Sequence, residues 1–235
     1  MRLHRFFIEE HLRNKKDITI YDDEVIHQWK DVFRLRAGDK VILLDDSGYE
    51  YLSEIGLLAK GKAEVKIIEQ TVSDILPTKE VWLFASIIKK DNFEWILEKG
   101  TEVGVTHFVP VLSDRTEKKD INMDRAYKIV REATEQSGRG KLPQVFEPAS
   151  LEEALENDVT SFIAFHMDGE PFSVSLRDDL RASEDSLGIL IGPEGGWSDN
   201  ELELFKEKNI PIYSLGKGVL RAETAAIVVP SLILL

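Results

Sequence analysis

Two glycine-bearing segments carry the residue types best suited to chemistry in this sequence. The first, Ile191-Gly-Pro-Glu-Gly-Gly196, has three glycines in five residues and lies just before Ser198. The second, Leu215 to Ala225, combines two glycines with a cation, a carboxylate and a hydroxyl at Arg221, Glu223 and Thr224. Glycine lets the backbone turn sharply or come close to a ligand. The segments are therefore candidates for a binding site, although a tight turn alone would also explain the first.

Both segments follow apolar runs typical of strands and lead into helices. LGILIG precedes the first and IPIYSLG the second, while Ser198-x-x-Glu201 is a capping box that begins the next helix. A third strand, SFIAFH, covers 161–166. Open α/β sheets bind small molecules at the carboxyl ends of their strands. We therefore expect the two segments to share one pocket at a sheet edge.

The rest of the chain predicts two domains with different patterns. From residue 80 onward strands and helices alternate, which indicates a mostly parallel sheet with helices on both faces. The helices expected there cover 92–103, 122–137, a short segment capped by Ser150-x-x-Glu153 and a final apolar stretch from about Glu223. Residues 1–73 instead show short alternating runs around a helix at 22–34, typical of a small β-rich barrel or sheet domain. We place a linker at 74–79.

Composition excludes several kinds of protein. With no cysteine, the chain has no thiol nucleophile, disulfide or cysteine-ligated metal, and its five histidines lack metal-binding spacing, so no metal is expected. No apolar run is long enough for a membrane span or a secretion signal, which favours a cytoplasmic location. The net charge is −13, but 16 acidic and only 4 basic residues lie in 142–215. The remainder is nearly neutral and can hold basic patches.

Three familiar motifs fail. The spacing of Gly56, Gly61 and Lys62 is that of a phosphate-binding loop, but Ala63 replaces the hydroxyl that would hold magnesium. Gly216-Lys-Gly218 begins a dinucleotide fingerprint whose third glycine position is Arg221. No Gly-x-Ser-x-Gly elbow is present, which argues against a serine hydrolase.

The motifs IGPEGGWSDNE and LGKGVLRAETA together resemble the C-terminal motifs of the bacterial 16S ribosomal RNA uridine-N3 methyltransferases, a SPOUT-class family that uses S-adenosylmethionine. The resemblance spans nearly the whole chain. It continues through Lys89-Lys-Asp91-x-x-Glu94, Lys99-x-Thr101-Glu102-x-Gly104-Val105, Arg115, Arg125, Glu132-Ala-x-x-Gln136-Ser137-x-Arg139, Pro143 and, at the front, His4-Arg5-Phe6-Phe7, His27, Val32-Phe-Arg34 and Gly38-Asp39. Gly218 stands where the family often has Arg, and Phe33 and Val103 replace leucines.

The resemblance implies an α/β fold with a trefoil knot at 80–235, a PUA-like RNA-binding domain at 1–73 and a homodimer. The adenine of S-adenosylmethionine carries no charge. Glycine-rich loops with apolar walls suit such a group, because their backbone N–H and C=O groups can reach it in a pocket without water. The residues expected to bind S-adenosylmethionine are Phe165, His166, Gly192, Gly195, Gly196, Leu215, Gly216, Val219, Leu220 and Thr224.

Methylation of uridine N3 requires loss of its proton, so the enzyme must stabilise an anion shared with O2 and O4. We expect Arg221 to do this, because a permanently charged planar donor favours the deprotonated base. Glu223 could accept the proton or orient Arg221, and Glu194 is the rival. The sequence does not choose between the two carboxylates, and the reaction needs no metal.

The expected partner is 16S ribosomal RNA or the small ribosomal subunit. The candidate phosphate ligands are Arg2, Arg5, Arg34, Arg36, Lys89, Lys90, Arg115, Arg125, Arg131 and Arg139. The final helix is apolar all round and so is expected to be buried, in the core or at a dimer seam. Two alternative functions are a SPOUT enzyme acting on another RNA nucleotide and a non-catalytic RNA-binding assembly factor.

Overall fold

The computed structural model describes residues 3–235, and their contacts group them into two compact units. Unit 1 runs up to Leu76 and includes Thr134–Leu142, whereas unit 2 comprises Pro77–Ala133 and Pro143–Leu235. The segment 134–142 thus groups with unit 1, although it lies inside the range 80–235. Its backbone is tied there by hydrogen bonds from Gly48 N to Gly140 O (3.2 Å) and from Leu142 N to Asp46 (2.8 Å).

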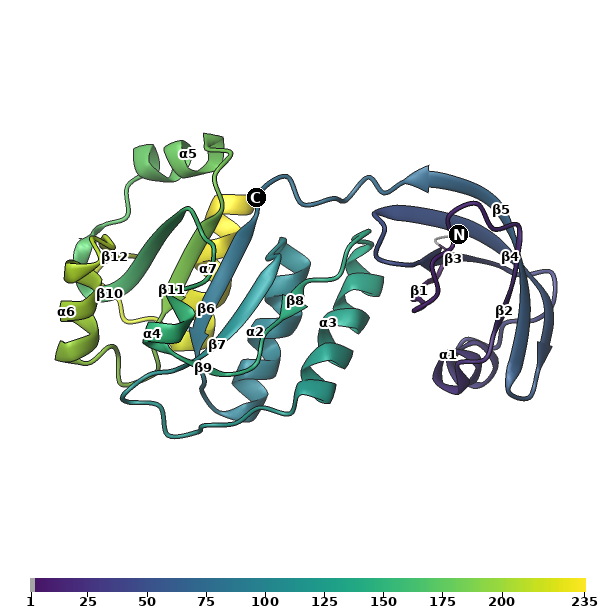
Figure 1. Ribbon diagram of the computed structural model, residues 1–235, viewed down its shortest axis with the longest axis horizontal. Helices are drawn as coiled ribbons and strands as arrows, with labels where there is room; N and C mark the ends of the chain where they lie inside the picture. The colour runs from purple at the N-terminus through teal and green to yellow at the C-terminus, as the bar shows by residue number, and fades with distance from the viewer. Residues whose placement is uncertain (1–2) are drawn as a thin grey trace. The chain divides into compact units, whose positions relative to one another are not determined.

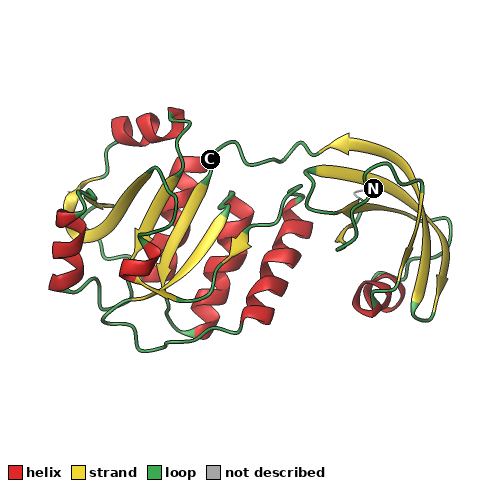
Figure 2. Ribbon diagram, in the orientation of Figure 1, coloured by secondary structure: helices red, strands yellow, loops and turns green. Residues whose placement is uncertain are grey.

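Unit 1 is built on a five-stranded sheet with the order β1-β3-β4-β5-β2 (Figures 1 and 2). Its strands are β1 (Arg5–Phe7), β2 (Asp17–Ile20), β3 (Lys40–Leu44), β4 (Tyr49–Ala59) and β5 (Lys62–Val72). β4 and β5 form a hairpin whose turn contains Gly61 at φ +70°, a conformation that glycine adopts without strain. The Gly56–Lys62 spacing therefore belongs to a strand and its hairpin turn.

The helix expected at 22–34 is shorter and divided. α1 (Asp23–His27) begins at Asp22, whose side chain accepts hydrogen bonds from the Glu24 and Val25 amides. A π-helical turn, η1 (Gln28–Val32), follows and buries Trp29 completely. Arg34 lies beyond the helix with φ +56°, so the chain leaves helical geometry before the predicted end.

Unit 2 contains the expected mostly parallel sheet, in the order β12-β10-β11-β6-β7-β8 with β9 beside β7. The strands are β6 (Val81–Ser86), β7 (His107–Leu112), β8 (Gln144–Val145), β9 (Ala149–Ser150), β10 (Ser161–Pro171), β11 (Leu187–Ile191) and β12 (Ile212–Ser214). Every residue of β6 and β11 is buried, as expected for central strands covered on both faces. The α/β fold class is confirmed.

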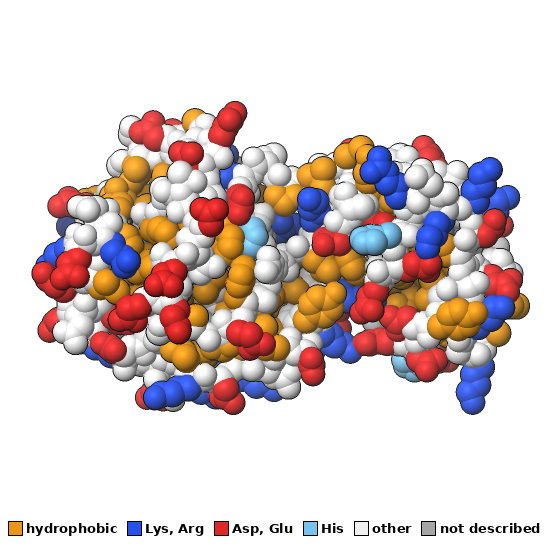
Figure 3. Space-filling view, viewed as in Figure 1, with side chains coloured by type: hydrophobic (Ala, Val, Ile, Leu, Met, Phe, Trp, Pro, Cys, Tyr) orange, Lys and Arg blue, Asp and Glu red, His pale blue; other side chains and the backbone are white. Residues whose placement is uncertain are grey.

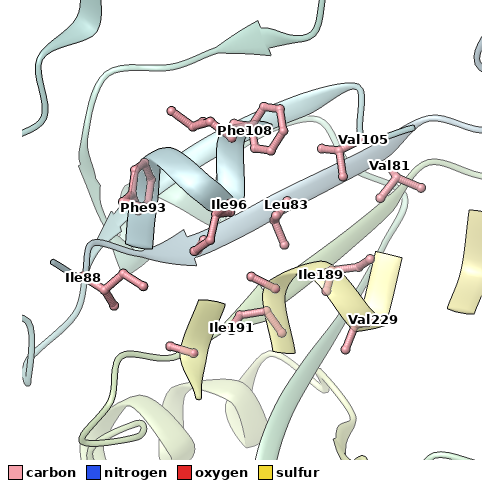
Figure 4. Packing of buried hydrophobic residues seen from close by; sticks show 14 of the residues in the cluster. Val81, Leu83, Ile88, Phe93, Ile96, Val105, Phe108, Ile189, Ile191 and Val229 are labelled. Carbon is pink, nitrogen blue, oxygen red and sulfur yellow. The ribbon is translucent and has the colours of Figure 1, made fainter. Parts of the chain in front are cut away.

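Helices cover both faces of this sheet (Figure 1). They are α2 (Lys90–Val103), α3 (Met123–Ser137), α4 (Leu151–Ala154), α5 (Val174–Ala182), α6 (Asp199–Glu207) and α7 (Ala222–Leu234). Alternate strand residues serve opposite layers: Leu83 packs with α2, α3 and α7, whereas Phe84 packs with α4 and α6. Figure 4 shows α2 and α7 side chains around Leu83 and Ile189. Helix α2 packs closely on Phe108 of β7 because residue 100 is a glycine. A Cβ on Gly100 would lie only 2.6 Å from the Phe108 ring.

Several predicted elements differ from the observed ones. The strand expected at 161–166 runs to Pro171, with a register shift after Phe165. Helix α5 was not predicted, although Ser173 caps its start; none of its residues is buried. The last helix is not buried all round: Ala226, Val229 and Ile233 are in the core, but Val228 and Leu232 are only half-buried. Within residues 3–235, no helix is long and apolar enough to cross a membrane.

Candidate functional site

Three strands of unit 2 bring the candidate segments together. In the parallel register, Phe165 of β10 is paired with Ile191 of β11 on one side and with Tyr213 of β12 on the other. The segments that follow these residues therefore leave the sheet side by side, although β11 and β12 are separated by helix α6 in the chain. The carboxyl ends of parallel strands are where such sheets bind ligands.

The first glycine segment is held in a fixed turn. Gly196 has φ +67°, and its amide donates to Pro193 O at 2.9 Å. Trp197 is 1% exposed and donates its indole N–H to Phe165 O at 3.1 Å, which anchors the turn to β10. A Cβ on Gly192 would lie 3.1 Å from the Trp197 ring, so a side chain there would disturb this anchor.

The start of α6 is fixed by the loop that follows β7. Ser198 and Glu201 form the predicted capping box, and Ser198 Oγ also donates to Asp114 at 2.5 Å. The Asp114 amide donates to Glu201 at 3.0 Å, and Arg115 Nη1 donates to Gly195 O at 2.7 Å. The backbone of the first glycine segment is thus braced from a third loop.

The second glycine segment is more open. Gly216 has φ +124°, and a Cβ added at Gly216 or Gly218 would meet no atom within 4 Å. Val219 and Leu220 are 71% and 42% exposed, so this segment presents two adjacent apolar side chains at its surface. The open space at Gly218 leaves room for the Arg that the family often has there.

The two segments line one pocket of about 500 Å³, within the range of roughly 300–1,000 Å³ that is usual for small-molecule sites. The expected residues that line it are Phe165, His166, Gly192, Glu194, Gly195, Gly196, Leu215, Gly216, Val219, Leu220 and Arg221. Thr224 and Glu223 do not line it. Both lie on the first turn of α7, whose lining residues are Ala222 and Ala225.

Sequence reasoning missed other lining residues, among them Met167, Asp168, Trp197, Tyr213 and Ser214. Met167 and Asp168 were overlooked because β10 was expected to end at 166. Gly169 was the available signal, because a glycine within a strand pattern can mark a close approach of another backbone. A Cβ on Gly169 would lie 2.5 Å from the Tyr213 backbone.

Charged groups at the pocket are unevenly exposed. The Arg221 side chain is 84% exposed, and its Nη1 lies 4.0 Å from Oε1 of Glu223, whose side chain is 5% exposed. Among the described residues, Glu223 Oε2 has no hydrogen-bond partner. Glu194 is exposed and lines the pocket. His166 is paired locally, since its Nδ1 accepts from the Asp168 amide at 3.2 Å.

The candidate phosphate ligands fall into distinct groups. Arg34, Arg36, Lys89, Lys90 and Arg115 are exposed. Arg34 follows the π-helical turn and has positive φ, two features that concentrate at functional sites. Figure 3 shows acidic side chains around α5 and α6, both in the acidic segment 142–215. Phosphate binding is therefore disfavoured on that part of unit 2.

Some candidate ligands are engaged within the protein, including the exposed Lys90 and Arg115, which contact Glu94 and Gly195 O. Arg5 pairs with Glu50 at 3.1 Å, and Arg125 donates two hydrogen bonds of 3.2 Å to Glu94. Arg139 is 2% exposed, and burial lowers its pKa to about 10, so as placed it cannot grip a phosphate. Arg131 is half-buried, and Arg2 lies outside the described residues. Within 3–235 no group of three or more His, Asp or Glu side chains could hold a metal ion.

Comparison with known proteins places this fold and site in a class. Residues 75–234 match the family model described as an RNA methyltransferase domain, and residues 22–68 match an RNA methyltransferase PUA domain. A PUA-bearing α/β RNA methyltransferase is the class that fold and site define.

The curated relatives identify the family within that class. The chain is 31% identical over 229 residues to ribosomal RNA small subunit methyltransferase E of Rickettsia conorii, with 97% of this chain and 93% of that one covered. The Bacillus subtilis protein of that name is 32% identical over 241 residues, with 95% and 93% covered. The chain belongs to this family of ribosomal RNA methyltransferases, which confirms the resemblance seen in the paired motifs.

A solved structure agrees with the whole fold. The crystal structure of the Neisseria gonorrhoeae ribosomal RNA small subunit methyltransferase E bound to S-adenosyl methionine has a TM-score of 0.88 and 27% identity. It covers 98% of this chain and 96% of that chain. The similarity thus includes both units.

Proposed function

We propose that this protein transfers a methyl group from S-adenosylmethionine to N3 of a uridine in the decoding region of 16S ribosomal RNA, within assembled small subunits. The observation that carries the proposal is the pocket of about 500 Å³ between the two glycine segments, with Arg221 at its lining. Membership of the small-subunit methyltransferase family supports the ribosomal substrate.

The pocket residues fit S-adenosylmethionine, which when bound supplies an electrophilic methyl group. Gly196 and Gly216 adopt positive φ, so backbone N–H and C=O groups can face a flat, uncharged adenine without interference from side chains. Leu215, Val219 and Leu220 supply apolar walls, and the exposure of the last two leaves surface for a ligand to cover. Thr224, also expected to bind the cofactor, lies outside this lining.

The charged side chains have separate roles in this proposal. Arg221, exposed at the pocket, places its guanidinium beside the pyrimidine oxygens and stabilises the N3-deprotonated base. Glu194 lines the same pocket and accepts the N3 proton, directly or through water. Glu223 is buried and outside the lining, so it orients Arg221 instead of reaching the substrate. The structure thereby favours Glu194 over Glu223 as the base.

RNA binding uses the exposed cations of both units, each acting on its own stretch of backbone phosphate. Arg34 and Arg36 serve unit 1, and Lys89, Lys90 and Arg115 serve unit 2. If these five engage one phosphate each, affinity falls with salt at a log-log slope of about −4. The PUA domain, for which RNA binding was expected, thereby contributes Arg34 and Arg36.

We also infer a homodimer, a knotted α/β domain and a cytoplasmic location, as the family resemblance implies. The half-buried apolar flank of α7, including Val228 and Leu232, is the surface that supports the dimer. Light scattering on the purified protein tests it, because a monomer at micromolar concentration contradicts this inference.

Nucleoside mass spectrometry of ribosomal RNA from cells that lack the gene tests the function. We expect 3-methyluridine to disappear from the small-subunit RNA and to return when the gene is restored. Loss of a different methylated nucleoside would instead assign another RNA target. Calorimetry with S-adenosylmethionine tests the alternative of a non-catalytic RNA-binding assembly factor, because a protein without a cofactor site gives no binding heat.

A further inference from the structure

A second cavity, of about 210 Å³, lies in unit 2 where β6 and β7 end. It is formed by the first turns of α2, the loop after β7 and the start of α3, and its lining is Ile88, Lys90, Phe93, Glu94, Leu97, Lys118, Asp120, Ile121, Asn122, Arg125 and Ala126. The strands of this sheet are parallel, so the cavity lies at the same sheet edge as the pocket between the glycine segments. Its volume is too small for a whole cofactor but suits a single flat ring.

One face of the cavity is apolar and includes an aromatic ring. Phe93, Leu97 and Ala126 are buried, and Ile121 is half-buried on the opposite loop. Unstacked RNA bases bind to aromatic and apolar faces of this kind.

A carboxylate oxygen in this cavity lacks a donor. Glu94 Oε1 is shielded from solvent and accepts no hydrogen bond within the described part of the chain, with Lys90 Nζ at 3.7 Å. The other oxygen, Oε2, receives both Arg125 hydrogen bonds at 3.2 Å. A desolvated acceptor is costly to leave unpaired, so a ligand N–H at Oε1 would be favourable. Arg125 is accordingly a group that positions Glu94, in place of the phosphate contact expected for it.

The rim of the cavity carries an excess of positive charge. Lys90, Lys118 and Arg125 outnumber Glu94 and Asp120, and Lys118 is exposed. The loop that supplies Lys118 also supplies Arg115, which donates to Gly195 O at the first pocket. One loop therefore contacts both sites, as a surface that follows a single RNA strand would require.

We propose that this cavity receives one unstacked, amino-bearing nucleobase from the same RNA strand that presents the target uridine, an inference that rests on the proposed function. The exocyclic amino group donates to Glu94 Oε1, as carboxylates accept from cytosine N4. The ring packs on Phe93 and Ile121, and Lys90 and Lys118 contact the flanking phosphates. Uracil has an oxygen at the corresponding position and is disfavoured there.

The test compares fluorescent octamers of cytidine and uridine binding to the full chain at fixed salt, because the two bases differ only in the group at C4 and in the proton on N3. We expect the wild-type protein to prefer cytidine by about three- to tenfold, the net effect of one hydrogen bond. Glu94→Gln should reduce that preference to within about twofold of unity. Glu98→Gln, one turn along α2, should keep it. An undiminished cytidine preference in Glu94→Gln, with normal thermal unfolding, would overturn the proposal.

A pair of adjacent lysines provides a second test that involves no buried residue. Lys118 lines the cavity and Lys119 does not, and both are exposed. Lys118→Ala should weaken octamer binding and reduce the log-log salt slope by about 1, whereas Lys119→Ala should not. Equal effects of the two variants would contradict the placement of RNA at this cavity. Calorimetry with S-adenosylmethionine distinguishes failure of the proposed function from failure of this inference. If the protein gives no binding heat with the cofactor, the proposed function is wrong, and the octamer experiment alone then decides whether the cavity binds a base.

Discussion

Arg221 Nη1 lies 4.0 Å from Glu223 Oε1 on the first turn of α7, and the two side chains differ sharply in exposure, at 84% and 5%. The pair joins a solvent-facing cation that lines the pocket to a buried anion that does not. Among the described residues, Glu223 Oε2 has no hydrogen-bond partner, whereas the ion pair with Arg221 is made by Oε1. In the proposed function, this arrangement separates the group assigned to the substrate, Arg221, from the group assigned to orient it, Glu223.

Replacing Arg221 with Ala should lower turnover far more than cofactor binding. Removing one preorganised donor to a developing anion costs about 100- to 1,000-fold in kcat. Single-turnover methylation assays and calorimetry measure the two quantities, and S-adenosylmethionine affinity should stay within about threefold if Arg221 acts on the base alone. Lys217→Ala, an exposed cation of the same segment outside the lining, is the matched control. Equal loss of turnover and cofactor affinity would make Arg221 a cofactor-binding group.

Glu223→Gln should reduce turnover only through Arg221. We expect about a tenfold loss in the wild-type background and none in the Arg221→Ala background, because residues that act as one unit are not additive. The measurement is a double-mutant cycle on kcat. Independent, additive losses would show that Glu223 acts on the substrate directly.

Glu194→Gln, in contrast, should also alter the pH–rate profile, as expected for the residue that accepts the proton.

The two capping boxes allow the cost of a lost helix cap to be separated from its effect on the site. Ser198→Ala and Ser150→Ala each remove an Oγ that accepts a backbone amide, so each should lower the unfolding free energy by about 1 kcal/mol. Only Ser198 begins the helix after the first glycine segment and donates to Asp114. Only Ser198→Ala should therefore raise the cofactor Kd. Unfolding in urea and calorimetry give the two readouts, and equal Kd values in both variants would contradict the role assigned to this brace.

His107 should make stability depend on pH. Burial lowers the pKa of its imidazole, an effect that outweighs the nearby Glu80 carboxylate, and the ring stacks on Trp82 at 3.9 Å. The unfolded state binds the proton more readily, so this contribution is complete above the unfolded pKa of about 6.5 and is lost as pH falls through and below it. His107→Phe keeps the stacking and should flatten the fall in unfolding free energy between pH 7 and 5. A wild-type slope in this variant, measured by urea denaturation, would assign the dependence to other groups.

The sequence by itself indicated most of the elements and the two glycine segments of the candidate site. Period-2 and period-3.6 patterns, the capping boxes at Ser150 and Ser198 and the glycines near 192 and 215 are local signals, because each depends on residues a few positions apart. The paired motifs identified the family for the same reason. Helix α5, which begins at the N-cap Ser173 and buries no side chain, was nevertheless missed.

Only the tertiary structure decided which residues of distant segments meet. The pairing of Phe165 with both Ile191 and Tyr213 is a long-range register, and no local pattern encodes it. It brings Met167 and Asp168 into the pocket and leaves Glu223 outside the lining. The burial of Arg139 and the unpaired oxygen of Glu94 were equally beyond the sequence, because burial and hydrogen bonding depend on neighbours supplied by other parts of the chain.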